Sequence, residues 1–300
     1  MTRNLWNQFS VWSKRTGQAA GAGPRQPDAH AGRETLLRFI GDHPDQAAAY
    51  LAHKDGFVRQ AALRSVPLSE ASPALAVHFL DRCNDWVPSL RPLALARLRE
   101  LVAVLPAPDL FPLVAALLGR ATNWKRWAGD MGGLTSVLDQ PAMRSAVKTY
   151  LLSADHGPVV RQARWAMRLG IVEDALADLA QRAKSGALRA VAIECLLDGK
   201  VYWTEGREKI WVDKPMGVFR TRAKWHARDL AVGPCDRLAL LQSGATDKSA
   251  AVRRVVAEHL CKTGLEKALS GVIAALLTDQ TPSVASRMGY FRQKWLPKAD

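Results

Sequence analysis

Apolar residues recur at helical spacing in the segment 247–262, which reads DKSAAVRRVVAEHLCK. Positions 252, 255, 256, 259 and 260 carry Val, Val, Val, His and Leu, which is the i, i+3, i+4, i+7, i+8 pattern of one helix face. The segment 186–197 (GALRAVAIECLL) fills the same five offsets, and in both segments an arginine, Arg253 or Arg189, follows the first apolar residue. One amphipathic helix cannot bury its apolar face alone. The shared pattern therefore predicts stacked helix pairs.

The same pair of an apolar residue and an arginine recurs along the chain at intervals of 28 to 35 residues. Such a period is typical of solenoids built from a helix, a turn and a second helix. The repeats at Lys125 and Phe219 match least well, and the last repeat lacks the arginine. The eight positions are Val58/Arg59, Leu90/Arg91, Lys125/Arg126, Val160/Arg161, Leu188/Arg189, Phe219/Arg220, Val252/Arg253 and Val284/Ala285. The sequence predicts an all-α solenoid of about seven to eight helix pairs.

The first 32 residues differ from the repeats. Leu5, Phe9 and Trp12 have helical spacing, and residues 16–32 are rich in Gly, Ala and Pro, as in a flexible linker. No acidic residue precedes Asp28, so this part is basic. We predict a basic arm and linker over 1–32 and the repeats over 33–300. The arm's helix either caps the first repeat or docks on a partner or an anionic membrane.

No apolar run near the N-terminus resembles a secretory signal, so we expect a cytoplasmic protein. The most apolar segment, 101–118, contains Pro106, Asp109 and Pro112, which break it well short of a membrane span. We expect no transmembrane segment. We also expect a monomer.

One segment, 201–214 (VYWTEGREKIWVDK), departs from the helical pattern. Its two ends are rich in β-branched and aromatic residues, and residues 205–208 contain a glycine suited to a tight turn. We predict a β-hairpin inserted between the two helices of the sixth repeat. Its aromatic residues either pack on the helices or belong to a probe for nucleic acid or protein. The probe would present Trp203, Arg207, Lys209 and Trp211.

Motifs such as DGFVRQAALRSV, HGPVVRQARWAMRLG and DKSAAVRRVVAEHL resemble HEAT repeats, and the likeness extends over about 34–294. HEAT arrays serve as protein scaffolds, as nucleic-acid binders and occasionally as enzymes, so the resemblance implies a fold more than a function. It also implies that the recurring arginine bonds an aspartate near the start of its own or the adjacent helix. Suitably placed aspartates are Asp55, Asp85, Asp155, Asp247 and Asp279.

The balance of charge points to an anionic partner. The chain has 42 Lys and Arg against 28 Asp and Glu, a net charge of +14, and such an excess attracts polyanions. Residues 200–229 alone carry eight basic and four acidic side chains. The expected partner is nucleic acid or an acidic protein segment.

Two of the ten tryptophans are expected to lie off the apolar helix faces: Trp165, five positions after Val160, and Trp225, six positions after Phe219. Exposed indoles stack on bases or anchor a partner, whereas tryptophans on the flank of a helix also pack against neighbouring repeats. The predicted binding residues are Trp165, Trp203, Arg207, Lys209, Trp211, Arg220, Arg222, Lys224 and Trp225.

An enzymatic alternative rests on a distant resemblance to HEAT-like alkylpurine DNA glycosylases. That family places aromatic residues and a carboxylate on its concave surface, where they stabilise positive charge as the glycosidic bond breaks. Trp225 and Asp229 are four residues apart on a predicted helix, and Trp127 with Asp130 is a looser candidate. The rest of the family's sequence pattern is absent, so Asp229 is a weak catalytic candidate.

The four cysteines are far apart and the seven histidines are scattered, without the spacing of a metal site. No glycine-rich nucleotide-binding loop is present either, and we expect no metal and no cofactor. We therefore predict a non-enzymatic binding scaffold with a basic surface, with a glycosylase as the alternative.

Overall fold

The computed structural model describes residues 27–28, 31–120, 124, 131–231, 233 and 235–296. The predicted N-terminal helix, most of its linker and the repeat marker at Lys125 lie outside the described residues. The chain divides into two compact units, Met1–Pro67 and Leu68–Asp300.

The first unit holds α2 (Arg33–Asp42), the 3-10 helix η1 (Pro44–Tyr50) and α3 (Gly56–Ser65). The three elements pack together around fully buried Leu36, Ile40 and Leu63. The Asp55 carboxylate accepts a hydrogen bond from the Phe57 amide at 2.8 Å and so caps the start of α3.

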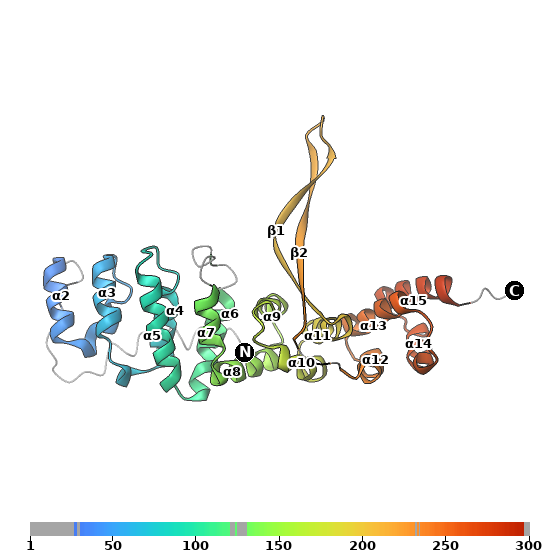
Figure 1. Ribbon diagram of the computed structural model, residues 1–300, viewed down its shortest axis with the longest axis horizontal. Helices are drawn as coiled ribbons and strands as arrows, with labels where there is room; N and C mark the ends of the chain where they lie inside the picture. The colour runs from blue at the N-terminus through green and yellow to red at the C-terminus, as the bar shows by residue number, and fades with distance from the viewer. Residues whose placement is uncertain are drawn as a thin grey trace. The chain divides into compact units, whose positions relative to one another are not determined.

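Helices also make up most of the second unit (Figure 1). Before the strands come α4 (Pro73–Arg82), α5 (Leu90–Val104), α6 (Leu110–Arg120), α7 (Met131–Leu138), α8 (Pro141–Ser153), α9 (Val159–Arg168), α10 (Leu176–Arg182) and α11 (Gly186–Asp198). After them come α12 (Arg237–Ala245), α13 (Ala250–Thr263), α14 (Ser270–Leu277) and α15 (Pro282–Trp295). The short 3-10 helices are η2 (Leu68–Glu70), η3 (Ala107–Asp109), η5 (Glu173–Ala175) and η6 (Lys267–Leu269).

Contacts between these helices follow a regular rule. Consecutive helices such as α4 and α5, α10 and α11, and α14 and α15 pack against each other. Many helices also contact the helix two positions further on, as α4 with α6, α6 with α8, α11 with α13 and α13 with α15. Helix α11 contacts α13 although the strands lie between them in the sequence. The strands are therefore an insertion that leaves α11 packed against α13.

The insertion is a two-stranded antiparallel hairpin, β1 (Lys200–Asp213) and β2 (Val218–Asp229). Paired residues run from Lys200 opposite Asp229 to Asp213 opposite Val218. At the usual rise per residue, strands of this length reach about 45 Å. Figure 1 shows the hairpin extending away from α9 and α11, the helices that contact β1.

The predicted hairpin is present, but two details of the prediction are wrong. The predicted turn, 205–208, lies inside β1, where the register shifts between Thr204 and Arg207. Gly206 has a positive φ (73°), as a turn glycine would, yet it belongs to this bulge. The true turn spans 214–217 and ends on Gly217, whose φ is 68°. The second error is the predicted helix at Phe219, since this residue lies in β2.

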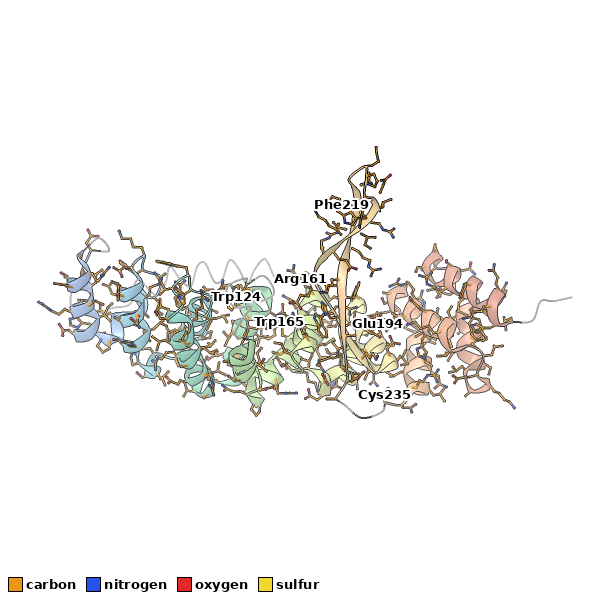
Figure 2. The ribbon with its side chains drawn as sticks, turned by 45° about the horizontal axis from the view of Figure 1, so that its top comes forward. Trp124, Arg161, Trp165, Glu194, Phe219 and Cys235 are labelled. Carbon is orange, nitrogen blue, oxygen red and sulfur yellow. The ribbon has the colours of Figure 1, made fainter. Side chains whose placement is uncertain are left out.

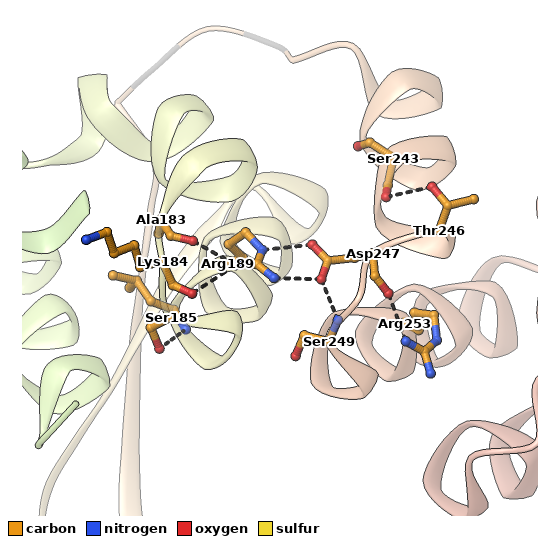
Figure 3. Close-up of polar contacts among 10 residues, drawn as sticks. Ala183, Lys184, Ser185, Arg189, Ser243, Thr246, Asp247, Ser249 and Arg253 are labelled. Atoms are coloured by element: carbon orange, nitrogen blue, oxygen red, sulfur yellow. Dashed lines mark hydrogen bonds and ion pairs between the residues drawn. The ribbon is translucent and has the colours of Figure 1, made fainter. Parts of the chain in front are cut away.

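The recurring arginines bond the loop that precedes their own helix. Figure 3 shows Arg189 donating to the carbonyl oxygens of Ala183 (2.7 Å) and Lys184 (3.2 Å), while its other nitrogens reach both carboxylate oxygens of Asp247 at 2.7 and 2.8 Å. Asp247 also accepts from the Ser249 amide at 2.7 Å, at the start of α13. One arginine thus joins α11 to the first turn of α13.

The same contacts recur at other repeats. Arg59, Arg91 and Arg253 each donate to the carbonyl oxygen of the residue six positions earlier. Arg253 also pairs with Asp279 at 2.6 Å. The expected bonds between arginine and aspartate are therefore confirmed for Arg189 and Arg253. Arg161 differs, because it is exposed and has no ion pair within the described part of the chain.

Candidate nucleic-acid interface on the hairpin

Helix α9 fixes the base of the hairpin through two arginines. Arg164 donates to the Tyr202 carbonyl oxygen at 2.9 Å and to Glu194 of α11 at 3.2 Å. Arg168, one turn later, pairs with Glu205 at 3.3 Å. Their spacing on α9 places both guanidinium groups along β1. The base of the hairpin is therefore tied to two helices at once.

A buried carboxylate fixes the end of β2. Glu173, 6% exposed, pairs with Arg228 and accepts from the Ala231 amide at 2.7 Å. Arg228 also donates to the Met167 carbonyl oxygen at the end of α9. A charge at this depth needs such partners, because burying it alone would be costly. These contacts hold the base of β2 against α9 and η5.

Trp203 belongs to this base and is not presented at the far end, as the probe interpretation required. Its ring is half-buried and stacks on His226 at 5.8 Å, with the Arg168 guanidinium 5.7 Å from the ring centre. The neighbouring Tyr202 hydroxyl bonds Asp198 at 3.2 Å. Burial, together with the Asp198 carboxylate, raises the pKa of Tyr202 to about 12. Both side chains therefore pack on the helices.

The distal half of the hairpin, residues 207–224, is strongly basic. It carries six basic residues against the two acidic residues Glu208 and Asp213, a difference of +4. Glu208 is neutralised by Arg222 at 3.0 Å, and Asp213 accepts from the Met216 amide in the turn. The basic residues are Arg207, Lys209, Lys214, Arg220, Arg222 and Lys224, all of them exposed. Most of this positive charge faces water.

Successive residues of a strand lie on opposite faces of the ribbon, and two paired residues share a face. The pairs Lys209 with Thr221 and Trp211 with Phe219 lie on one face, which we call the aromatic face. Arg207 lies there too, opposite Ala223, and so does Trp225, opposite Thr204. The other face, the ion-pair face, carries Glu208 opposite Arg222 and Ile210 opposite Arg220, and Lys224 follows in the same alternation.

Several exposed apolar side chains of the distal half were not predicted. Phe219 lies there, well away from the helices that carry Arg161, Trp165 and Glu194 (Figure 2). Its exposed neighbours are Val212, Met216 and Val218. A signal for β2 was present in the sequence, because residues 219–228 alternate between small or aromatic and basic side chains, the period of a strand. The anchoring residues Arg164, Arg168 and Glu173 gave no such signal.

Two further predicted residues are Trp165 on α9 and Trp225 on β2. Trp165 is half-buried on α9, the helix of Arg164 and Arg168. Trp225 is 56% exposed, and the Arg164 guanidinium lies 5.4 Å from its ring centre. The arginines of α9 thus adjoin the hairpin, whereas no contact joins Trp165 to it among the described residues.

The prediction that Trp225 and Asp229 lie close together on one helix is wrong. Both residues lie on β2, where four positions separate them by about 13 Å. The Asp229 side chain is 86% exposed and 3.9 Å from Lys200. Trp127 and Asp130 lie outside the described residues. The carboxylate is therefore not held against an indole ring.

The described residues contain no group of three or more His, Cys, Asp or Glu side chains arranged to hold a metal ion. Among the described helices, none combines the length and apolar character needed to cross a membrane. Comparison of the chain with protein-family models, with curated proteins and with solved structures finds no match.

Proposed function

We propose that this chain is a HEAT-like α-solenoid that acts as a non-enzymatic scaffold and binds nucleic acid with its hairpin. The observation that carries the proposal is the contrast within the hairpin: a base held by buried contacts and a distal half whose cations face water. Nucleic-acid phosphates are the ligand that such a surface attracts most strongly.

The solenoid part of the proposal is supported by the helix contacts. One row of helices continues past the insertion, since α11 meets α13 and α13 meets α15. The arginine of one repeat reaches the aspartate of the next in Arg189–Asp247 and Arg253–Asp279. These are the contacts that the resemblance to HEAT repeats implied.

The choice of nucleic acid is supported by the shape and chemistry of the distal half. The major groove of duplex DNA admits a two-stranded β-ribbon, and a single strand of nucleic acid can also lie along such a ribbon. Arginine and lysine supply phosphate contacts, and exposed aromatic rings supply stacking. An acidic protein segment would use the same cations but would have less use for the rings.

The test compares the wild-type chain with a variant whose hairpin is shortened. Residues 205–224 are replaced by Asn-Gly, which suits a two-residue turn between the paired residues Thr204 and Trp225. Binding of fluorescein-labelled DNA, both a single strand and its duplex, is measured by anisotropy. Wild type is expected to bind at about 50 mM salt and to lose about 100-fold in affinity by about 200 mM, because phosphate contacts release counterions. The shortened variant is expected to lose binding and to keep its melting temperature.

A charge-matched control separates the hairpin from the general basic character of the chain. The triple variant Arg207→Ala, Lys209→Ala, Arg220→Ala removes three cations from the hairpin. The control Lys184→Ala, Arg254→Ala, Lys267→Ala removes three exposed cations from the helical part, none of which has an ion pair within the described residues. Equal binding by both triple variants would reject the hairpin as the contact. Binding of polyglutamate without binding of DNA would instead identify an acidic protein segment.

A further inference from the structure

The aromatic face of the hairpin carries large rings that are exposed to water, whereas the ion-pair face does not. Attraction of phosphates by charge alone does not require such rings. Trp211, Phe219 and Trp225 are 47%, 41% and 56% exposed. All three belong to the aromatic face, together with Arg207 and Lys209. Exposing large rings to water is unfavourable unless a partner covers them. Phosphate contacts alone would need no rings.

From this face we infer that the hairpin binds single-stranded nucleic acid, with unpaired bases stacked on its rings and phosphates contacted by Arg207 and Lys209. The inference rests on the proposed function and specifies its substrate. Every base offers a π-face, so the binding is independent of sequence. In a duplex the bases are stacked on one another and their faces are closed to side chains.

The geometry of the rings fits a strand laid along the ribbon. Trp211 and Phe219 lie together, with ring centres 5.5 Å apart and planes at 72°. Trp225 is six positions from Phe219 along β2, about 20 Å. Each end also has a cation against a ring: Lys209 lies 4.4 Å from the Phe219 ring centre and Arg164 lies 5.4 Å from that of Trp225. The pair Trp211 and Phe219 is thus one exposed aromatic site and Trp225 is another, and Arg207 lies between them.

A lipid bilayer fits these residues less well. Membrane insertion requires apolar residues gathered at the tip, and Val212, Met216 and Val218 are there. However, Asp213 and Lys214 stand at the same end of the hairpin, and burying their charges among lipid tails would be costly. Trp225 would also stay far from the bilayer, at the other end of the strand. Because the rings are spread along the ribbon, they favour a nucleic-acid strand over a membrane surface as the partner.

The experiment measures anisotropy with labelled oligothymidine and with a duplex of equal length. Wild type is expected to bind the single strand more tightly than the duplex. Loss of stacking on one base corresponds to about 5- to 150-fold in affinity. Trp211→Ala and Phe219→Leu are therefore each expected to weaken single-strand binding within that range and to leave duplex binding unchanged. Phe219→Tyr keeps a ring and is expected to bind as wild type.

Ile210→Ala is the matched control, since it removes an apolar side chain from the ion-pair face. Thermal melting of each variant shows that it is folded. If wild type binds DNA but Phe219→Leu binds both probes as wild type does, the stacking inference is wrong and the proposed function stands. If wild type binds neither probe, both are wrong, and binding to vesicles that contain phosphatidylserine would then assign the tip to a membrane.

Discussion

Arginines in the helical part and arginines in the hairpin have opposite surroundings. Arg189 is 4% exposed and donates to two carbonyl oxygens and a carboxylate. Arg220, on the ion-pair face of the hairpin, is exposed and has no ion pair within the described residues. The two residues carry the same charge. Their positions make Arg189 a structural residue and leave the charge of Arg220 available to a ligand.

The difference shows that the net charge of +14 does not identify the binding surface by itself. A buried cation must be paired, and once paired it contributes little to the field outside the protein. A solvated cation needs no partner and retains its attraction for phosphate. Most cations in the distal half of the hairpin are solvated in this way.

Removing Arg189 is expected to have the largest effect on stability. Arg189→Ala leaves the Asp247 carboxylate, whose side chain is 14% exposed, and two loop carbonyl oxygens without their donor. Breaking a buried pair in this way costs about 3–5 kcal/mol of the free energy of unfolding. We expect the melting temperature to fall by roughly 10 °C in circular dichroism.

Arg220→Ala is the matched control for this comparison. It removes the same side chain from the hairpin and is expected to change the free energy of unfolding by less than about 0.5 kcal/mol. A similar loss of melting temperature in both variants would contradict the distinction between the two kinds of arginine.

The repeat pattern in the sequence was sufficient to predict the helices because each repeat buries the same face. Helices are confirmed at the markers Val58, Leu90, Val160, Leu188, Val252 and Val284. The same regularity produced the error at Phe219, where the repeat interval was extended through an insertion. The alternation after Val218 is a local signal for a strand, and it conflicts with the long-range spacing of the repeats.

The candidate site was predictable only in part. Composition and charge identified Arg207, Lys209 and Trp211, which need no tertiary contact to be exposed. The location of Trp203 could not be deduced, because it depends on Arg168 of α9, 35 positions earlier. Strand pairing was also needed to assign Phe219 to the same face as Trp211. Such contacts between distant positions leave no trace in a single sequence.

Acid sensitivity gives a second, smaller test of the helical arginines. The hydrogen bond from Arg253 lowers the pKa of Asp279 from 3.8 to about 2. A carboxylate with a lowered pKa stabilises the fold fully above pH 3.8, and this contribution is lost as the pH falls through about 2. It amounts to about 2 kcal/mol of the free energy of unfolding. The stability difference between wild type and Arg253→Ala is therefore expected to shrink from neutral pH to about pH 2.

Urea unfolding at several pH values measures this difference. Other carboxylates titrate in both proteins and cancel. Placing Arg253→Ala in an Asp279→Asn background provides the control, because its effect should no longer depend on pH. An equally steep dependence in that background would assign the acid sensitivity to another group. An unchanged melting temperature in Arg253→Ala at neutral pH would exclude Arg253 as a structural arginine altogether.

The smallest expected effect concerns packing, which is tight at Gly244, where α12 meets α13, and open at Gly271 of α14. A Cβ at Gly244 of α12 would lie 2.7 Å from Cγ2 of Val256 on α13. Gly271 of α14 has no other atom within 4 Å of that position. Gly271→Ala is expected to stabilise the chain by about 0.5 kcal/mol through helix propensity. Gly244→Ala gains the same propensity but forces the two helices apart, for a net loss of about 1 kcal/mol.

Val256→Ala removes the methyl group that Gly244→Ala would meet, so the two substitutions should not be additive. Val256→Ala alone costs stability by leaving a cavity. In that background, the Cβ added at position 244 occupies part of the vacated space, and Gly244→Ala should become neutral or stabilising. Melting temperatures of the four proteins of this cycle test the argument. Additive losses would show that α12 and α13 have room to move apart, so that the contact between position 244 and Val256 does not explain the loss in Gly244→Ala.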